Sequence, residues 1–168
     1  MDDRGEKTLF GQLFSQAKDR IEIFSKKPSH DSRDNPLPFK AKLKGEGSED
    51  IGGVFREIID LICWNEFESE SLPLFIKTPN NVNAYGEDRE KWTINPSSLS
   101  HTHLEMFAFL GALIGMSLRS NHLLALNLPS IFWKLILSHE LVSSDLTHLD
   151  SFCAQVLIHT YHSLTHLY

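Results

Sequence analysis

The sequence predicts one mainly helical domain of the α+β class, with short strands packed on helices. Two observations carry this prediction: several segments place apolar residues at helical spacings of three and four, and two short stretches have the patterns of strands. The composition agrees, because 41% of the 168 residues are hydrophobic and 23% are charged, close to the average of globular domains. The length is that of one ordinary domain, so we expect a single core.

The first predicted element is an amphipathic helix from Thr8 to Phe24. Its apolar residues lie on one stripe: Phe10, Leu13, Phe14, Ala17, Ile21 and Phe24. Three prolines between Lys27 and Pro38 then predict a loop, because proline lacks a backbone donor and fixes φ. We treat residues 1–37 as a separate segment made of this helix and the proline-rich loop.

A strand is predicted from Phe39 to Lys44, where apolar residues alternate with three lysines. Lysines along one face suit an exposed or edge strand. A glycine-rich turn follows, and a helical pattern then runs from Ile51 to about Asn65. The glycines of the turn are Gly45, Gly47, Gly52 and Gly53.

The middle of the chain predicts a buried strand and a long helix. Leu72–Ile76 is a short apolar run that fits the strand, and a polar loop from Thr78 to Lys91 separates it from Trp92–Asn95. The helix runs from about Ser100 to Arg119, and we expect it to be almost completely buried. Two glycines on its apolar face would let another element pack closely. The residues of this predicted face are Leu104, Phe107, Ala108, Gly111, Ile114, Gly115 and Leu118.

Two helices are predicted near the C-terminus. Pro129 occupies a position where the first turn of a helix tolerates proline, and a short helical pattern follows it. Ser143, Ser144 and Asp145 then offer capping oxygens for a last helix. The stripe of that helix is Leu146, Leu149, Phe152, Cys153, Val156 and Leu157.

Charge and hydropathy exclude two classes of partner. The net charge is -6 at pH 7, and binding to a phosphate backbone depends on basic side chains, so we expect no nucleic-acid partner. The most apolar run, Met106 to Leu118, is shorter than the ~20 residues that span a bilayer, so we expect no membrane anchor. Met1 to Lys7 lacks the pattern of a signal peptide, which favours the cytosol or the nucleus.

The glycine-rich turn is a candidate phosphate-binding loop, because glycines between a strand and a helix can direct backbone donors at an anion. The residues argue against this function. Asp50 stands where a dinucleotide-binding motif needs glycine, and no Lys-Ser or Lys-Thr pair follows. Glu46 and Glu49 would also repel a phosphate. We therefore expect a structural turn and no nucleotide cofactor.

Three histidines near the C-terminus have a spacing that metal sites use. His159, His162 and His166 fall at i, i+3 and i+7, on one side of the last predicted helix. No cysteine or carboxylate extends them into a zinc motif. We expect a solvated face and no metal, and keep a zinc-binding helix as a weaker alternative.

Neither cysteine has the sequence context of a nucleophile. Cys63 and Cys153 each lie among apolar neighbours in a predicted helix, so we expect burial to raise the pKa of both thiols and keep them inert. Their separation gives no support for a disulfide framework. A serine nucleophile is not expected either, because the sequence has no Gly-x-Ser-x-Gly turn.

A set of motifs from Gly45 onward resembles the HECT domain of ubiquitin-protein ligases. Gly45-Glu46-Gly47 followed by Asp50–Glu57 is similar to the strand, turn and helix that open the domain, written GEG and then D-x-GG-x-x-RE. The resemblance covers about Pro38 to Asp150. Within the family, the sequence is similar to the HERC-like ligases. Its further motifs follow in order: Leu72–Asn80, Asn95–Pro96, His103–Gly111, Ile114–Arg119, Leu128–Leu135 and Leu141–Asp150.

The resemblance implies a partial amino-terminal lobe of that domain over residues 38–150, with residues 151–168 as a divergent end of the last helix. In the family, the ubiquitin-conjugating enzyme docks on a later part of this lobe, and the thioester cysteine lies in a separate carboxy-terminal lobe. We expect the chain to stop at Tyr168 before both. Neither Cys63 nor Cys153 resembles the family's Thr-Cys loop, so the resemblance assigns no catalytic residue.

Two functions remain open at this point. The first is a scaffold segment of a ligase that, when complete, transfers ubiquitin from a conjugating enzyme to a substrate lysine. The second is a non-catalytic interaction module of the ubiquitin pathway. Ubiquitin and a conjugating enzyme are the partners that the resemblance implies for the complete domain. A lobe without its remaining elements is also expected to expose apolar surface.

Overall fold

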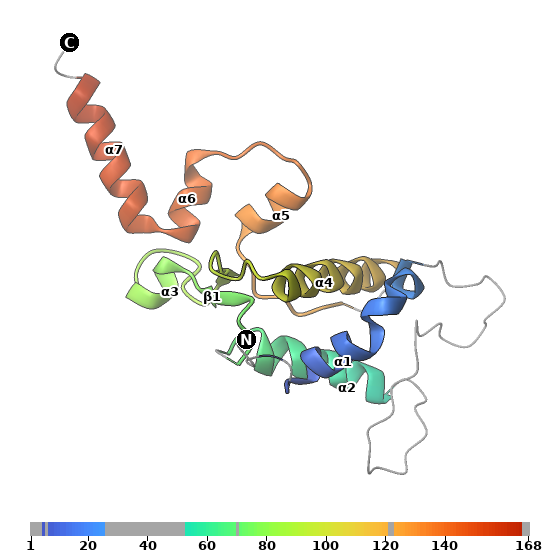
Figure 1. Ribbon diagram of the computed structural model, residues 1–168. Coiled ribbons are helices and arrows are strands. Elements are labelled where there is room, and N and C mark those ends of the chain that lie inside the picture. The colour runs from blue at the N-terminus through green and yellow to red at the C-terminus, as the bar shows by residue number, and fades with distance from the viewer. Residues whose placement is uncertain (1–4, 6, 26–52, 70, 121–122, 166–168) are drawn as a thin grey trace. The chain divides into compact units, whose positions relative to one another are not determined.

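The computed structural model describes residues 5, 7–25, 53–69, 71–120 and 123–165 (Figure 1). The chain divides into two compact units, where length and composition predict one core. The first unit contains Met1–Leu74 and Asn95–Leu126, and the second contains Phe75–Ile94 and Asn127–Tyr168. No helix within the described ranges is long and apolar enough to cross a bilayer.

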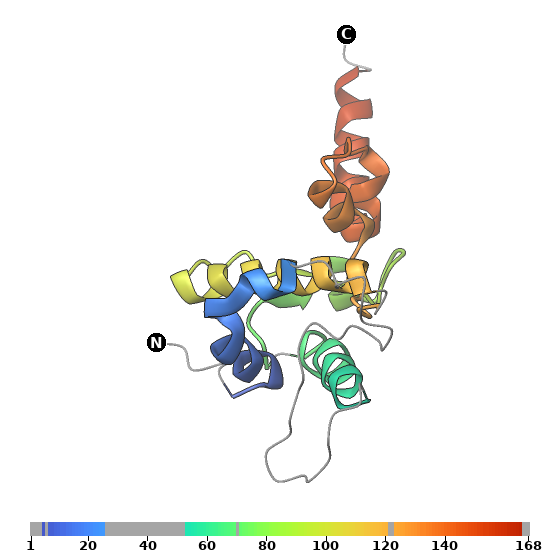
Figure 2. The ribbon, with the colours of Figure 1, turned by 90° about the vertical axis from the view of Figure 1, so that its right-hand side faces the viewer.

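The first unit begins with α1 (Leu9–Ala17), which continues as the 3-10 helix η1 (Lys18–Ser25). The predicted helix over residues 8–24 is therefore confirmed in place, with a kink at Arg20, where φ is -127° and ψ is 28°. Thr8 caps α1, because its side chain accepts a hydrogen bond from the Gly11 N–H. Segment η1 lies against α4 (His101–Ser120), as Figure 2 shows.

The predicted helix near residues 51–65 is also confirmed. It consists of α2 (Gly53–Leu61) and the π-helical turn η2 (Ile62–Glu66), which continue one another. Its buried side includes Ile58, Ile59, Ile62 and Cys63. The predicted strand over 39–44 and the turn glycines at 45, 47 and 52 lie outside the described residues.

Helix α4 runs where the sequence predicts it, but it buries a different face. Leu104 is 53% exposed and Leu118 is 79% exposed, so the expected near-complete burial is wrong. No described atom would meet a Cβ at Gly111, and at Gly115 only the Arg119 side chain is near, so no close packing occurs there among the described residues. The buried apolar residues are Met106, Phe109, Leu110, Leu113 and Met116.

The core of the first unit forms where α1 meets α4. The ring of Phe109 contacts both Phe10 and Phe14, with centroids 5.6 and 5.7 Å apart. These edge-to-face pairs bury large aromatic surface, which dominates the energetics of small cores. The partner helix therefore selects the face of α4 that carries Phe109.

The second unit contains an antiparallel pair of short strands, β1 (Phe75–Lys77) and β2 (Trp92–Ile94), in which Phe75 pairs with Ile94. Strand β1 starts three residues later than the predicted run, and Leu72 and Leu74, which precede it, are buried without belonging to a strand. The predicted loop over 78–91 contains a short helix, α3 (Pro79–Asn83). Thr78 caps it by accepting the Asn81 N–H at 3.2 Å.

Three helices complete the second unit: α5 (Ser130–Ile136), α6 (Ser143–Leu149) and α7 (Ser151–Thr165). The single last helix that the sequence predicts is divided at Asp150, whose extended backbone has φ -145° and ψ 90°. Figure 1 shows α6 and α7 as separate helices. The predicted stripe does not form a buried face, because Phe152, Val156 and Leu157 are about half exposed or more.

Candidate functional site

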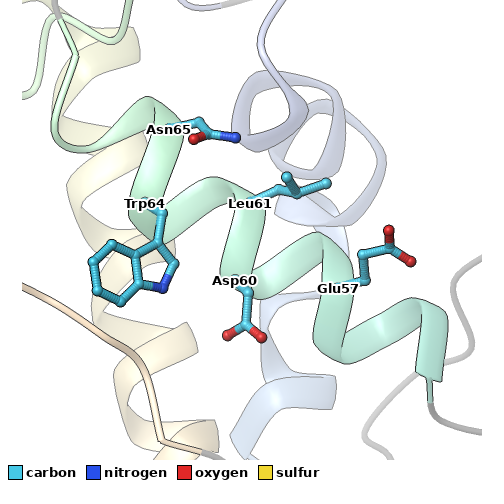
Figure 3. A pocket seen from close by; sticks show the side chains of 5 residues that line it. All are labelled: Glu57, Asp60, Leu61, Trp64 and Asn65. Carbon is cyan, nitrogen blue, oxygen red and sulfur yellow. The ribbon is translucent and has the colours of Figure 1, made fainter.

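A shallow hollow of about 370 Å³ lies on the exposed side of α2 and η2 (Figure 3). The spacing of four residues places its lining on two neighbouring ridges of the helix. Trp64 is 63% exposed, and Leu61 is 38% exposed. No periodic pattern in the sequence marks this surface, because it depends on one exposed tryptophan. The lining residues are Glu57, Asp60, Leu61, Trp64 and Asn65.

Cys63 lies on the opposite, buried side of the same helix. Burial raises the pKa of its thiol to about 11, and the negative charges of Asp60 and Glu68 act in the same direction, while a backbone hydrogen bond at Ala125 opposes them. The expected burial of Cys63 and the expected rise of its pKa are therefore confirmed. A protonated thiol is a poor nucleophile.

Glu66 ends η2 and holds the beginning of α1. Its carboxylate accepts hydrogen bonds from the backbone N–H groups of Leu9, at 2.5 Å, and Phe10, at 2.8 Å. Burial raises the pKa of this carboxyl, and the two N–H groups partly offset the rise. A helix N-terminus has unpaired N–H groups and a partial positive charge, so a carboxylate there is a structural clamp. The sequence contained no signal for this pairing, which joins residues 57 positions apart.

The expected burial of Cys153 is wrong, because this thiol is exposed. It lies on α7, where only Ser151 and Ala154 are buried. The apolar stripe that predicted its burial is divided between α6 and α7, which meet at Asp150. Residues before and after Asp150 therefore do not share one helix face. Exposure alone does not make a thiol nucleophilic.

Two of the three candidate metal ligands, His159 and His162, lie on the exposed surface of α7, and His166 lies outside the described residues. Within the described part of the chain, no group of three or more His, Cys, Asp or Glu side chains is placed to hold a metal ion.

The Thr78-Pro79-Asn80 motif forms the centre of the second unit. Asn80 is only 2% exposed. Its side-chain amide donates to the carbonyls of Glu87 and Thr147, both at 2.9 Å, and its oxygen accepts the N–H of Ser151 at 2.7 Å. One side chain thus joins α3, the loop after it, α6 and α7. Buried polar groups of this kind are costly to leave unpaired, so the motif requires asparagine.

The loop that Asn80 holds approaches α7 too closely for a side chain. Gly86 has a φ of +83°, and a Cβ there would lie 2.0 Å from the Ser151 hydroxyl oxygen. Glycine alone meets both requirements. The loop also places Asp88 Oδ2 3.2 Å from His148 Nδ1 of α6.

An ion pair links α5 to the beginning of α6. Lys134 Nζ donates to Asp145 at 2.8–2.9 Å, and Asp145 also accepts the Val142 N–H at 2.8 Å. The hydrogen bond from Lys134 is the main cause that lowers the pKa of Asp145, followed by the bond from Val142. Together with the hydrogen bonds of the Asn80 side chain, these bonds position α3, α5, α6 and α7. Cys153 takes part in none of these hydrogen bonds.

Comparison with known proteins identifies the family. The model of the HECT-domain (ubiquitin-transferase) family matches residues 61–167. The chain is 34% identical to E3 ubiquitin-protein ligase HERC2 of Mus musculus over 150 residues, which are 87% of this chain and 3% of that protein. It is 30% identical to E3 ubiquitin-protein ligase HUWE1 of Mus musculus over 132 residues, 76% of this chain and 3% of that protein.

The family match extends through α7, where we expected the sequence to diverge. It begins at Leu61, the last residue of α2, and the D-x-GG-x-x-RE motif, which ends at Glu57, lies before the matched range. The chain spans about 3% of the length of the curated relatives it matches. The match covers more than half of the 168 residues, and the similarity to HERC2 agrees with the HERC-like motifs. The chain therefore belongs to the HECT-domain (ubiquitin-transferase) family.

Proposed function

We propose that this chain is a scaffold segment of a HECT-type ubiquitin-protein ligase. In the complete protein, ubiquitin would pass from a conjugating enzyme to a cysteine outside this chain and then to a substrate lysine. The observation that carries the proposal is the family match over residues 61–167, which includes the Asn80-centred arrangement of helices. We place the protein in the cytosol or the nucleus, where ubiquitin and the conjugating enzyme would be its partners.

The two cysteines support a scaffold role in different ways. Cys63 is buried, with its pKa raised to about 11, so it has little thiolate at neutral pH. Cys153 is accessible, but it lies within α7 and not on a loop of the kind that carries the family's catalytic cysteine. We therefore assign neither thiol to ubiquitin transfer.

A thioester assay tests the assignment of the cysteines. The purified chain is mixed with ubiquitin, activating enzyme, ATP and a panel of conjugating enzymes, and resolved on a non-reducing gel. We expect no thiol-sensitive ubiquitin adduct on the chain. An adduct that disappears in Cys153→Ala, and persists in Cys63→Ala, would overturn the scaffold proposal and make Cys153 an acceptor.

A graft tests the scaffold role directly. This chain replaces the matching segment of mouse HERC2, whose remaining sequence supplies the acceptor cysteine, and self-ubiquitination is measured. We expect the graft and its Cys63→Ala/Cys153→Ala version to be active, and a graft with Asn80→Ala to lose most activity. An inactive but folded graft, together with ubiquitin binding by the free chain, would favour the interaction-module alternative.

A further inference from the structure

The hollow on α2 and η2 combines an exposed aromatic ring with unpaired negative charge. Figure 3 shows Asp60 and Trp64 projecting to the same side of the helix. Glu57 and Asp60 are exposed, and neither forms an ion pair with any residue that the structure describes. Arg56 is next in sequence but does not line the hollow. The surface is therefore acidic.

The position of the hollow along the helix adds to this charge. Trp64 and Asn65 belong to the last turn before Glu66, and that turn carries no basic residue. The C-terminal end of a helix has a partial negative charge, which basic side chains usually offset. A cation from elsewhere would be attracted to this end of the helix.

The chemistry of the lining selects a guanidinium group as the best occupant. Arginine is planar, so it stacks on an indole face while its N–H fork pairs with a carboxylate, and lysine can offer only a point charge. Trp64 supplies the ring, Asp60 and Glu57 supply the acceptors, and Leu61 supplies an apolar contact for an adjoining side chain. An anionic or nucleic-acid ligand would be repelled by the same carboxylates.

We propose that the Trp64 hollow is a docking site for an arginine-bearing peptide segment of a protein partner. Binding at this surface does not depend on ubiquitin transfer. Each contact is solvent-exposed and individually weak, so we expect a dissociation constant of about 5–10 mM for a single short peptide. A longer partner would add contacts around this anchor.

The experiment is a peptide titration of the full ¹⁵N-labelled chain, followed by the indole N–H signals of its tryptophans. The probe is the capped hexapeptide Gly-Ser-Leu-Arg-Gly-Ser, and the matched probe carries citrulline, which keeps the shape and removes the charge. Trp64→Phe assigns the Trp64 signal. We expect this signal to shift saturably with the arginine peptide, with the Trp92 and Trp133 signals unmoved, and the shift to weaken at high salt.

Two charge-matched variants complete the test. Glu57→Gln/Asp60→Asn removes the carboxylates while preserving shape, and should weaken binding at least fivefold. Glu22→Gln/Glu140→Gln changes the net charge equally at exposed positions that do not line the hollow, and should leave binding unchanged. A Trp64 signal that does not shift at 50 mM peptide (about five times the weakest expected dissociation constant), equal shifts with the citrulline probe, or equal weakening by both double variants would overturn the proposal. Each of these results would leave the ubiquitin-transfer proposal unaffected.

Discussion

The side-chain oxygen of Asn80 accepts a hydrogen bond from the backbone N–H of Ser151, and this bond joins the starts of α3 and α7 across 71 positions of sequence. The side-chain NH₂ group of Asn80 also donates hydrogen bonds to two backbone carbonyls, those of Glu87 and Thr147. Asn80 follows the capping residue Thr78 and the first helical residue Pro79. The Thr78-Pro79-Asn80 motif thus begins α3, and the Asn80 side chain also joins α3 to the loop after it, to α6 and to α7.

Replacing Asn80 by alanine should lower the free energy of unfolding of the second unit by about 2–4 kcal/mol, because two carbonyls and one N–H would lose partners in a buried place. Urea denaturation followed by fluorescence of the chain's tryptophans measures the change. Asn83→Ala, at an exposed position on the same helix, is the matched control and should change stability by less than about 0.5 kcal/mol. Equal effects of the two variants would contradict the role of Asn80.

Glu66 should make the first unit less stable as pH rises. Burial raises the pKa of its carboxyl above the ordinary value of 4.5, so the folded state binds the proton more tightly than the unfolded state. The resulting stabilisation is fully present below the unfolded-state pKa and is lost as pH rises through the folded-state pKa. Glu66→Gln stays neutral, so its stability relative to the natural chain should improve as pH rises above the ordinary pKa of 4.5. Urea denaturation at several pH values gives the two curves, and parallel curves would contradict this prediction.

The two cysteines should differ strongly in their reaction with a thiol reagent. With a pKa of about 11, Cys63 has only about one thiolate in a thousand at pH 8 and is also buried. Cys153 is exposed and should be alkylated within minutes by iodoacetamide, with Cys63 following only in denaturant. Peptide mass spectrometry locates the modification. Equal rates in the folded chain would show that the inner face of α2 and η2 opens readily.

Helix α7 should bind hydrophobic dye and promote self-association. It has no Asp, Glu, Lys or Arg between Ser151 and Thr165, and it exposes six large apolar side chains. They are Phe152, Val156, Leu157, Ile158, Tyr161 and Leu164. A contiguous apolar patch on a folded chain favours association.

Leu157→Gln/Leu164→Gln changes two positions seven apart, on one side of α7, and should reduce both dye fluorescence and the mass measured by sedimentation. Thr160→Gln, an exposed polar position of the same helix, is the control and should change neither. A natural chain that stays monomeric at high concentration without binding dye would contradict this expectation.

Local patterns were sufficient for most elements. The stripe from Phe10 to Phe24 predicted α1 and η1, the long apolar run predicted α4, and the ordered motifs indicated the HECT family. The kink at Arg20 and the break at Asp150 were not visible, since no proline or glycine marks either position. A periodic pattern reports the type of an element more reliably than its interruptions.

The sequence by itself determined the mainly helical class, the positions of the long helices and the family, because periodicity and motif order are properties of the chain. Only the tertiary structure decided which faces are buried. Helix α4 is apolar on almost every side, so its pattern cannot select a face, and the rings of Phe10 and Phe14 select the one that carries Phe109. Likewise, the hydrogen-bond partners of the Asn80 and Glu66 side chains lie at least seven positions away in sequence. Such pairings depend on how helices meet, which local sequence does not encode.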